Sequence, residues 1–394
     1  MRLWIRWLTS LVLLLVFLAA LGFWAQRQRL ETREPATLFF PSPYSLGTVG
    51  ERVAVVVSSR QSGVVRVELW ADGEPVAATT NAVPSAAPWE VTLAWRPNET
   101  GPHTLFARLY TADGAVLDTA LRTLEVVPPG ALAYVTAEQG TPAVMVARTD
   151  GLKREVWALE AKDPAWANEV VLFVVRDGGI WTLTGPHNRP RPIVNAEFQA
   201  ERPAWSGKTL AFTSRKGGRP RVLLRSAAGD ITALPFQAEA VMDPAWNPNG
   251  DELVVAATRD GNTDLYRISL RTGEVQQLTT HLATDRQPAW SPDGRVLLFV
   301  SDRDGVPQVY WLALTGKQAP VPVTDVPFGA DHPSWSPDGT WFAYSAQLGA
   351  TPSSRELVLQ RLRDNYAVRV TFNNVEDTAP AWRPTTPVPP NRGR

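Results

Sequence analysis

Six acidic side chains recur at corresponding places along the last two thirds of the sequence. Each lies three to five residues before a tryptophan that ends a Pro-Ala-Trp or Pro-Ser-Trp segment or a close variant of it. The six are Asp163, Glu201, Asp243, Asp285, Asp331 and Asp377. Carboxylates gathered around one opening would create a negative potential that binds a cation or the basic end of a peptide. The structural alternative is that each carboxylate accepts hydrogen bonds from backbone amides where a strand begins, and both interpretations stay open.

Histidine is the other residue type that could contribute chemistry, and the chain has only four. His281 and His332 lie on segments that lead into neighbouring repeats, so we add them to the six carboxylates as candidate ligand-binding residues. They could bind a metal or act as acid and base, or they could be polar residues of a rim. The sequence predicts no catalytic residue, no metal ligand and no cofactor.

No familiar catalytic motif accompanies these residues. The sequence contains no G-x-S-x-G, H-E-x-x-H, Walker-type lysine loop or G-x-G-x-x-G segment. It also contains no cysteine, which excludes disulfides, thiolate metal sites and a cysteine nucleophile. Lys plus Arg equals Asp plus Glu, 39 against 39, so no overall basic excess favours nucleic-acid binding. We therefore expect a binding protein rather than an enzyme.

The spacing of the tryptophans predicts the fold that positions these side chains. Successive tryptophans are 39, 41, 44, 45 and 47 residues apart, at positions 166, 205, 246, 290, 335 and 382. Such periods are typical of a four-stranded propeller blade, and six copies predict six blades. Residues 132–151 match the middle of a blade that lacks a first strand, whereas residues 377–384 form a strand without a blade. We therefore expect the last strand to complete the first blade and close the ring.

Three repeats carry a longer motif, with Trp-Ser-Pro-Asp-Gly at 290–294 and 335–339 and a near copy at 246–250. With these motifs, residues 131–384 resemble the β-propeller repeats of the TolB family, which also occur beside hydrolase domains in the prolyl oligopeptidase family. The resemblance implies a propeller that binds partner proteins in the cell envelope. Serine, proline, aspartate and glycine in this order favour a type I turn, so we expect Asp293 and Asp338 to be turn residues.

Two further segments precede the propeller. Residues 7–24 carry no charge and are long enough to cross a bilayer as a helix, so residues 1–25 are predicted to be a membrane anchor. A cleaved signal peptide is the alternative. Residues 26–35 are polar and are expected to form a stalk. Residues 36–127 alternate apolar and polar positions between turn motifs, which predicts a β-sandwich that resembles bacterial immunoglobulin-like modules.

The sequence thus predicts an all-β protein with an N-terminal transmembrane helix, an immunoglobulin-like β-sandwich and a six-bladed propeller closed by the C-terminal strand, followed by a disordered tail at 385–394. We expect a single-pass protein of the cell membrane with most of its chain outside the cytoplasm. Its propeller is expected to be a non-catalytic platform for an envelope protein or peptide. The alternatives are a hydrolase or lyase with its site at the channel mouth, and a regulatory propeller for a separately encoded peptidase. The sequence does not indicate an oligomeric state.

Overall fold

The computed structural model describes residues 36–40, 45–79, 87–138, 140–316, 318–349, 351, 355–373 and 375–385. The chain divides into two compact units between Val126 and Val127. The first is a sandwich of two sheets and the second is a ring of six sheets.

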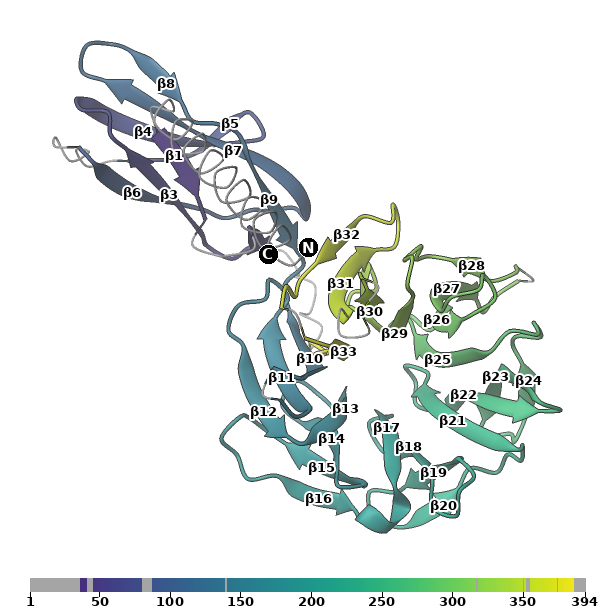
Figure 1. Cartoon of the computed structure of the whole chain (residues 1–394). Helices are drawn as coiled ribbons and strands as arrows, with labels where there is room; N and C mark the ends of the chain where they lie inside the picture. Colours follow the sequence, from purple (N-terminus) through teal and green to yellow (C-terminus); the bar gives the residue numbers. More distant parts are fainter. Residues whose placement is uncertain are drawn as a thin grey trace, which may run out of the picture. The chain divides into compact units, whose positions relative to one another are not determined.

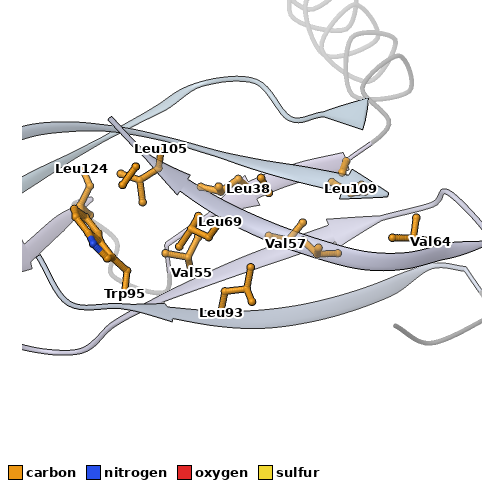
Figure 2. Packing of buried hydrophobic residues seen from close by; sticks show 14 of the residues in the cluster. Leu38, Val55, Val57, Val64, Leu69, Leu93, Trp95, Leu105, Leu109 and Leu124 are labelled. Atoms are coloured by element: carbon orange, nitrogen blue, oxygen red, sulfur yellow. The ribbon is translucent and has the colours of Figure 1, made fainter. Parts of the chain in front are cut away.

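The first unit consists of two antiparallel sheets that share one apolar core. One sheet has the order β1 (Ala36–Phe39), β3 (Val53–Ser59), β6 (Trp89–Trp95). The other has the order β2 (Leu46–Thr48), β9 (Arg122–Val127), β7 (Gly101–Thr111), β4 (Val64–Ala71), β5 (Glu74–Ala78), and β8 (Val116–Asp118) pairs with β7. Every second residue of β7 is buried, as expected for a strand with one face on a core. Figure 2 shows the apolar side chains of both sheets meeting between the strands.

The second unit contains six four-stranded antiparallel sheets, which we call blades 1 to 6. Blade 1 comprises β33 (Asp377–Trp382), β10 (Ala131–Thr136), β11 (Ala143–Arg148) and β12 (Glu155–Leu159). Blade 2 comprises β13 (Ala161–Trp166), β14 (Leu172–Arg176), β15 (Gly179–Leu183) and β16 (Arg191–Val194). Blade 3 comprises β17 (Ala200–Trp205), β18 (Leu210–Ser214), β19 (Arg221–Arg225) and β20 (Ile231–Ala233), preceded by the 3-10 helix Ala196–Phe198.

Blades 4 to 6 repeat the same four-stranded pattern. Blade 4 comprises β21 (Ala240–Trp246), β22 (Glu252–Arg259), β23 (Asn262–Ser269) and β24 (Val275–Gln277). Blade 5 comprises β25 (Asp285–Trp290), β26 (Val296–Ser301), β27 (Gln308–Ala313) and β28 (Val321–Pro322). Blade 6 comprises β29 (Ala330–Trp335), β30 (Trp341–Gln347), β31 (Arg355–Arg361) and β32 (Ala367–Arg369).

The innermost strand of each blade carries the repeated tryptophan, and these strands surround the centre of the ring (Figure 1). The predicted closure is confirmed: β33 pairs antiparallel with β10, with Leu132 opposite Trp382 and Thr136 opposite Asp377. Strand β33 also contacts β29 and β13, so the last strand of the chain lies between the inner strands of blades 6 and 2. The seam of the ring is therefore a paired sheet rather than an open edge.

The tryptophans link neighbouring blades. An indole N–H donates to a backbone carbonyl of the preceding blade in four cases, at 3.0–3.2 Å: Trp166 to Ala381, Trp246 to Ala204, Trp290 to Ala245 and Trp335 to Ala289. These tryptophans therefore act as wedges with a directional contact.

The repeated turns have the expected structure. Ser291 Oγ donates to Asp293 at 2.6 Å and accepts the N–H of Val296 at 3.0 Å. Ser336 makes the same pair of contacts, to Asp338 at 2.6 Å and from the N–H of Trp341 at 2.9 Å. Asp293 and Asp338 are turn residues, as predicted.

One part of the predicted fold class needs correction. The prediction included a transmembrane helix, but no helix in the described part of the chain is long and apolar enough to cross a membrane. The expectation had rested on the length and hydropathy of one uncharged run, which permit a membrane span without specifying one. The predicted anchor at 1–25, the predicted stalk at 26–35 and residues 386–394 of the predicted tail lie outside the described residues.

Candidate functional site

Each inner strand of the propeller is interrupted by a two-residue bulge at the same position. The residue before the repeated proline and the proline itself have no pairing partner on the second strand, as between Lys162 and Ala165 or between Met242 and Ala245. Proline causes part of this break because it has no N–H to donate to the neighbouring strand. The bulge turns the side chain of the residue before the proline away from the hydrogen-bonded strand pair.

The six residues before these prolines form what we call the mouth ring. They are Asp163, Arg202, Asp243, Gln287, His332 and Ala379, one from each blade. All six have a left-handed backbone, with φ between 48° and 57°. This conformation costs a residue with a Cβ atom roughly 1–2 kcal/mol. The ring and its prolines line a cavity of about 130 Å³. They are the third or fourth residue of inner strands that are six or seven residues long, so the cavity lies around the middle of these strands.

Arg202 reaches across the mouth ring. Its Nη2 lies 2.5 Å from Nε2 of His332, which belongs to the opposite blade of the six. Its Nε lies 3.8 Å from Oδ1 of Asp163 and 3.8 Å from Oδ1 of Asp243, in the two adjacent blades. One guanidinium thus stands among two carboxylates and an imidazole, and its side chain keeps 29% of its surface exposed.

Backbone amides of the ring are satisfied by a simple rule. Where a ring side chain is an acceptor, it takes the N–H of the next ring residue: Asp163 takes that of Arg202 at 3.2 Å, Asp243 that of Gln287 at 3.1 Å and Gln287 that of His332 at 2.8 Å. These contacts join the inner strands of adjacent blades. Asp163 and Asp243 therefore accept hydrogen bonds from backbone amides, as the structural interpretation expects. These amides belong to the inner strand of the neighbouring blade.

A hydroxyl accepts the next backbone N–H after Arg202, which has no acceptor atom, and after His332, whose acceptor nitrogen Nε2 is bound to Arg202 instead. After Arg202, the N–H of Asp243 donates to Thr213 Oγ1 at 3.1 Å, and after His332, the N–H of Ala379 donates to Ser345 Oγ at 3.1 Å. Thr213 and Ser345 occupy the same position on the second strands of blades 3 and 6. The corresponding residues of the other blades are apolar: Val135, Val175, Ala256 and Val300.

His332 is held as a neutral imidazole. Since Nε2 accepts from Arg202, the proton lies on Nδ1, which donates to Asp331 Oδ1 at 2.7 Å. Burial lowers the pKa of His332, and the positive charge of Arg202 lowers it further, against the opposing effect of Asp331. Burial alone would raise the pKa of Asp331, but His332, Arg355 and Arg202 together lower it.

The structure separates the eight candidate residues into different environments. Asp163, Asp243 and His332 belong to the mouth ring. Glu201 and Asp331 stand one residue earlier in their strands, outside the cavity lining. Glu201 binds Arg215 at 2.7 Å and Lys162 at 3.3 Å. Asp331 binds Arg355 at 2.6 Å as well as His332.

The remaining candidates lie away from the cavity. Asp285 and Asp377 begin their strands and are fully buried. Both oxygens of Asp285 accept from Nη2 of Arg303 at 3.0 Å, while Oδ2 of Asp377 accepts from Asn373 at 2.9 Å. Burial raises the pKa of Asp377 despite its hydrogen bonds. His281 is exposed, and its Nδ1 accepts the N–H of Ala283 in its own loop. The six carboxylates therefore occupy three registers rather than one ring.

Three residues of the site were not among the candidates chosen from the sequence. Arg202, Gln287 and Ala379 line the cavity but are not acidic, so a search by residue type passes over them. Their common feature is the position immediately before the repeated proline. Within the described residues, no group of three or more His, Asp or Glu side chains is placed to hold a metal ion. The ring offers two carboxylates, a guanidinium, an amide and an imidazole to a polar ligand.

Comparisons with known proteins agree with the propeller architecture. TolB from Acinetobacter baumannii superposes with a TM-score of 0.58 at 19% identity, covering 73% of this chain and 81% of that one. A putative TolB from Agrobacterium tumefaciens gives 0.52 at 17% identity, covering 62% and 89%. Hydrazine synthase from Kuenenia stuttgartiensis gives 0.53 at 10% identity, covering 65% and 47%. At these identities the likeness concerns the fold alone.

No curated protein sequence matches the chain. The profile of the PD40 family, described as the TolB β-propeller domain, matches residues 188–386, which is half of the chain. This range includes the inner strands of blades 3 to 6 and the closing strand of blade 1. On its ring of six blades and this match, the chain belongs to the TolB β-propeller domain family.

Proposed function

We propose that the propeller is a non-catalytic binding platform for a protein or peptide of the cell envelope, which docks on the side of the ring where the cavity opens. The observation that carries this proposal is a set of exposed apolar side chains on that side. The loops between blades end where the inner strands begin, close to the mouth ring. Leu282, Phe328 and Phe372 lie on three such consecutive loops and are 93%, 44% and 39% exposed.

In the corresponding loops of the preceding blades the aromatic residues are partly or fully buried. Phe198, before β17, packs edge-on against Phe212 at 6.1 Å between ring centres. Phe236, before β21, is 7% exposed and packs against Tyr266. Leu348, in the hairpin between β30 and β31, adds a further exposed side chain at the same end of blade 6. Apolar exposure confined to neighbouring blades is typical of a protein-binding surface.

Charges on the same loops indicate the chemistry of the partner. Asp304, Asp325 and Glu376 are exposed carboxylates on the mouth side of blades 5, 6 and 1. The nearby arginines Arg303 and Arg355 are largely buried and bound to Asp285 and Asp331, and Nε of Arg355 also lies 3.9 Å from Oε1 of Glu376. A partner segment with apolar and basic side chains complements this surface. We propose that the first unit, an immunoglobulin-like sandwich, serves as a spacer.

The capture of envelope proteins by the purified full-length chain tests this function. A Leu282→Ser/Phe328→Ser variant should retain roughly one tenth or less of the captured partner, because apolar contacts at an interface centre dominate binding. Val170→Ser is the matched control, since Val170 is 55% exposed in the turn after β13, at the other end of the channel. Equal capture by the double variant and the wild type would contradict the proposed docking surface.

A further inference from the structure

Arg202 occupies the place in the cavity where a cationic ligand would be expected. We infer that Arg202 is an internal stand-in for a guanidinium or ammonium group of the partner, which displaces Arg202 and enters between Asp163 and Asp243. This inference rests on the proposed binding function and specifies the group that the partner inserts. It assigns the cavity to a basic side chain rather than to an anion or a metal ion.

The surroundings of Arg202 show that the cavity accepts a guanidinium. Acceptors stand on three sides: Oδ1 of Asp163, Oδ1 of Asp243 and Nε2 of His332. Nε2 of His332 is the acceptor nitrogen of a neutral imidazole. It can therefore accept a hydrogen bond from an N–H group of the ligand, as it does from Arg202. The two carboxylates outnumber the one cation, and Gln287 and Ala379 complete the ring without adding charge.

Arg202 is also held in a way that permits exchange. Its contacts with the two carboxylates are both 3.8 Å long, beyond hydrogen-bond distance, and only the contact with His332 is short. Its side chain keeps 29% of its surface accessible, so water can hydrate the guanidinium when it leaves. The carboxylates remain oriented after displacement, because Asp163 and Asp243 also accept the backbone N–H groups of Arg202 and Gln287.

The cavity is largely buried but keeps contact with solvent, which connects it with the docking surface. The side chains of Asp163, Asp243 and His332 retain 13%, 14% and 17% of their surface. They lie two or three residues inside the inner strands, and the loops bearing Leu282 and Phe328 lead into two strands of the same ring. A segment bound to those loops can therefore place one basic side chain in the cavity while its apolar residues stay on the surface.

Calorimetric titration of the full-length chain at neutral pH tests the inference with two matched probes. N-acetyl-arginine amide carries the guanidinium, and N-acetyl-citrulline amide is its neutral analogue. Arg202→Ala should bind the arginine probe about tenfold more tightly than the wild type and should not gain affinity for citrulline. Arg215→Ala is the control, since Arg215 pairs with Glu201 outside the cavity and its loss should leave the affinity unchanged.

The carboxylates supply the second arm of the test. Adding Asp163→Asn and Asp243→Asn to Arg202→Ala should abolish the gain in affinity for the arginine probe. If Arg202→Ala unfolds the chain, as judged by circular dichroism, Arg202→Gln removes the same charge with a longer side chain and should show the same gain. The inference is overturned by a folded variant with no gain, by an equal gain for citrulline, or by a gain that persists without the carboxylates. Capture by the Leu282→Ser/Phe328→Ser variant is measured separately, and equal capture by that variant and the wild type would overturn the proposed function instead.

Discussion

Nη2 of Arg202 and Nε2 of His332 meet 2.5 Å apart across the channel, although the two residues are 130 positions apart in the sequence. The contact requires an acceptor nitrogen on His332, because every N–H of a guanidinium is a donor. It therefore couples the protonation of one side chain to the position of another. The mouth of the channel should respond to pH for this reason.

Acidification from pH 8 to 5 should destabilise the protein through His332. The folded pKa of His332 is lowered, so the unfolded chain binds the proton more readily than the folded one does. Its stabilising contribution is complete above the ordinary pKa near 6.5 and is lost as the pH falls toward the lower, folded value. Urea unfolding of His332→Gln should show a weaker pH dependence than the wild type. Equal slopes in His332→Gln and the wild type would contradict the coupling.

The sequence specifies the blades more fully than it specifies the site. The tryptophan spacing predicts blade number and ring closure because each repeat must supply the same wedge and the same inner strand. Asp163 lines the cavity, whereas Asp285 and Asp377 do not, although all three were grouped by their distance from the tryptophan. A shift of one or two residues along a strand changes the face on which a side chain lies and how deeply it is buried. The bulge before each proline sets the true register. Arg202 could have been found by aligning the repeats on that proline, whereas its partner His332 depends on the ring being closed.

Asp285 and Asp377 occupy the same register and are both fully buried, yet their substitution should have opposite effects. Asp285→Asn removes the partner of Arg303, whose side chain is only 14% exposed, and should cost about 3 kcal/mol of unfolding free energy. In contrast, Asp377 has no such ion pair, and its Oδ1 has no hydrogen-bond partner among the described atoms. Chemical denaturation at neutral pH measures both variants.

Asp377→Asn should leave the protein as stable as the wild type or more stable at neutral pH. The raised pKa of Asp377 means that its stabilising contribution is present below the unfolded value of 3.8 and is lost as the pH rises through the folded value. Asparagine has no charge to bury, so the variant should lose this part of the pH dependence. A large destabilisation at neutral pH would show that the ionised carboxylate is needed.

Thr213 should be required for the stability of blade 3 and blade 4, because Arg202 cannot accept the hydrogen bond from the N–H of Asp243. Thr213→Val removes the acceptor for the N–H of Asp243 and should cost about 1–3 kcal/mol, since a partly buried amide loses its partner. Thr213→Ser keeps the hydroxyl and should stay near wild type. Thermal melts of the two variants check this expectation. If valine is tolerated as well as serine, the hydroxyl does not substitute for a ring acceptor.

The pairing of β33 with β10 should decide whether the ring melts as one unit. Trp382 is 5% exposed and lies opposite Leu132, so Trp382→Ala should cost about 3–5 kcal/mol. A chain that ends at Asn374 lacks the whole of β33 and leaves β10 as an open edge beside blades 6 and 2. Calorimetry should give this shortened chain a lower and broader propeller transition than a chain that ends at Pro384. Identical transitions would mean that the closing strand adds nothing to the stability of the ring, despite its paired register.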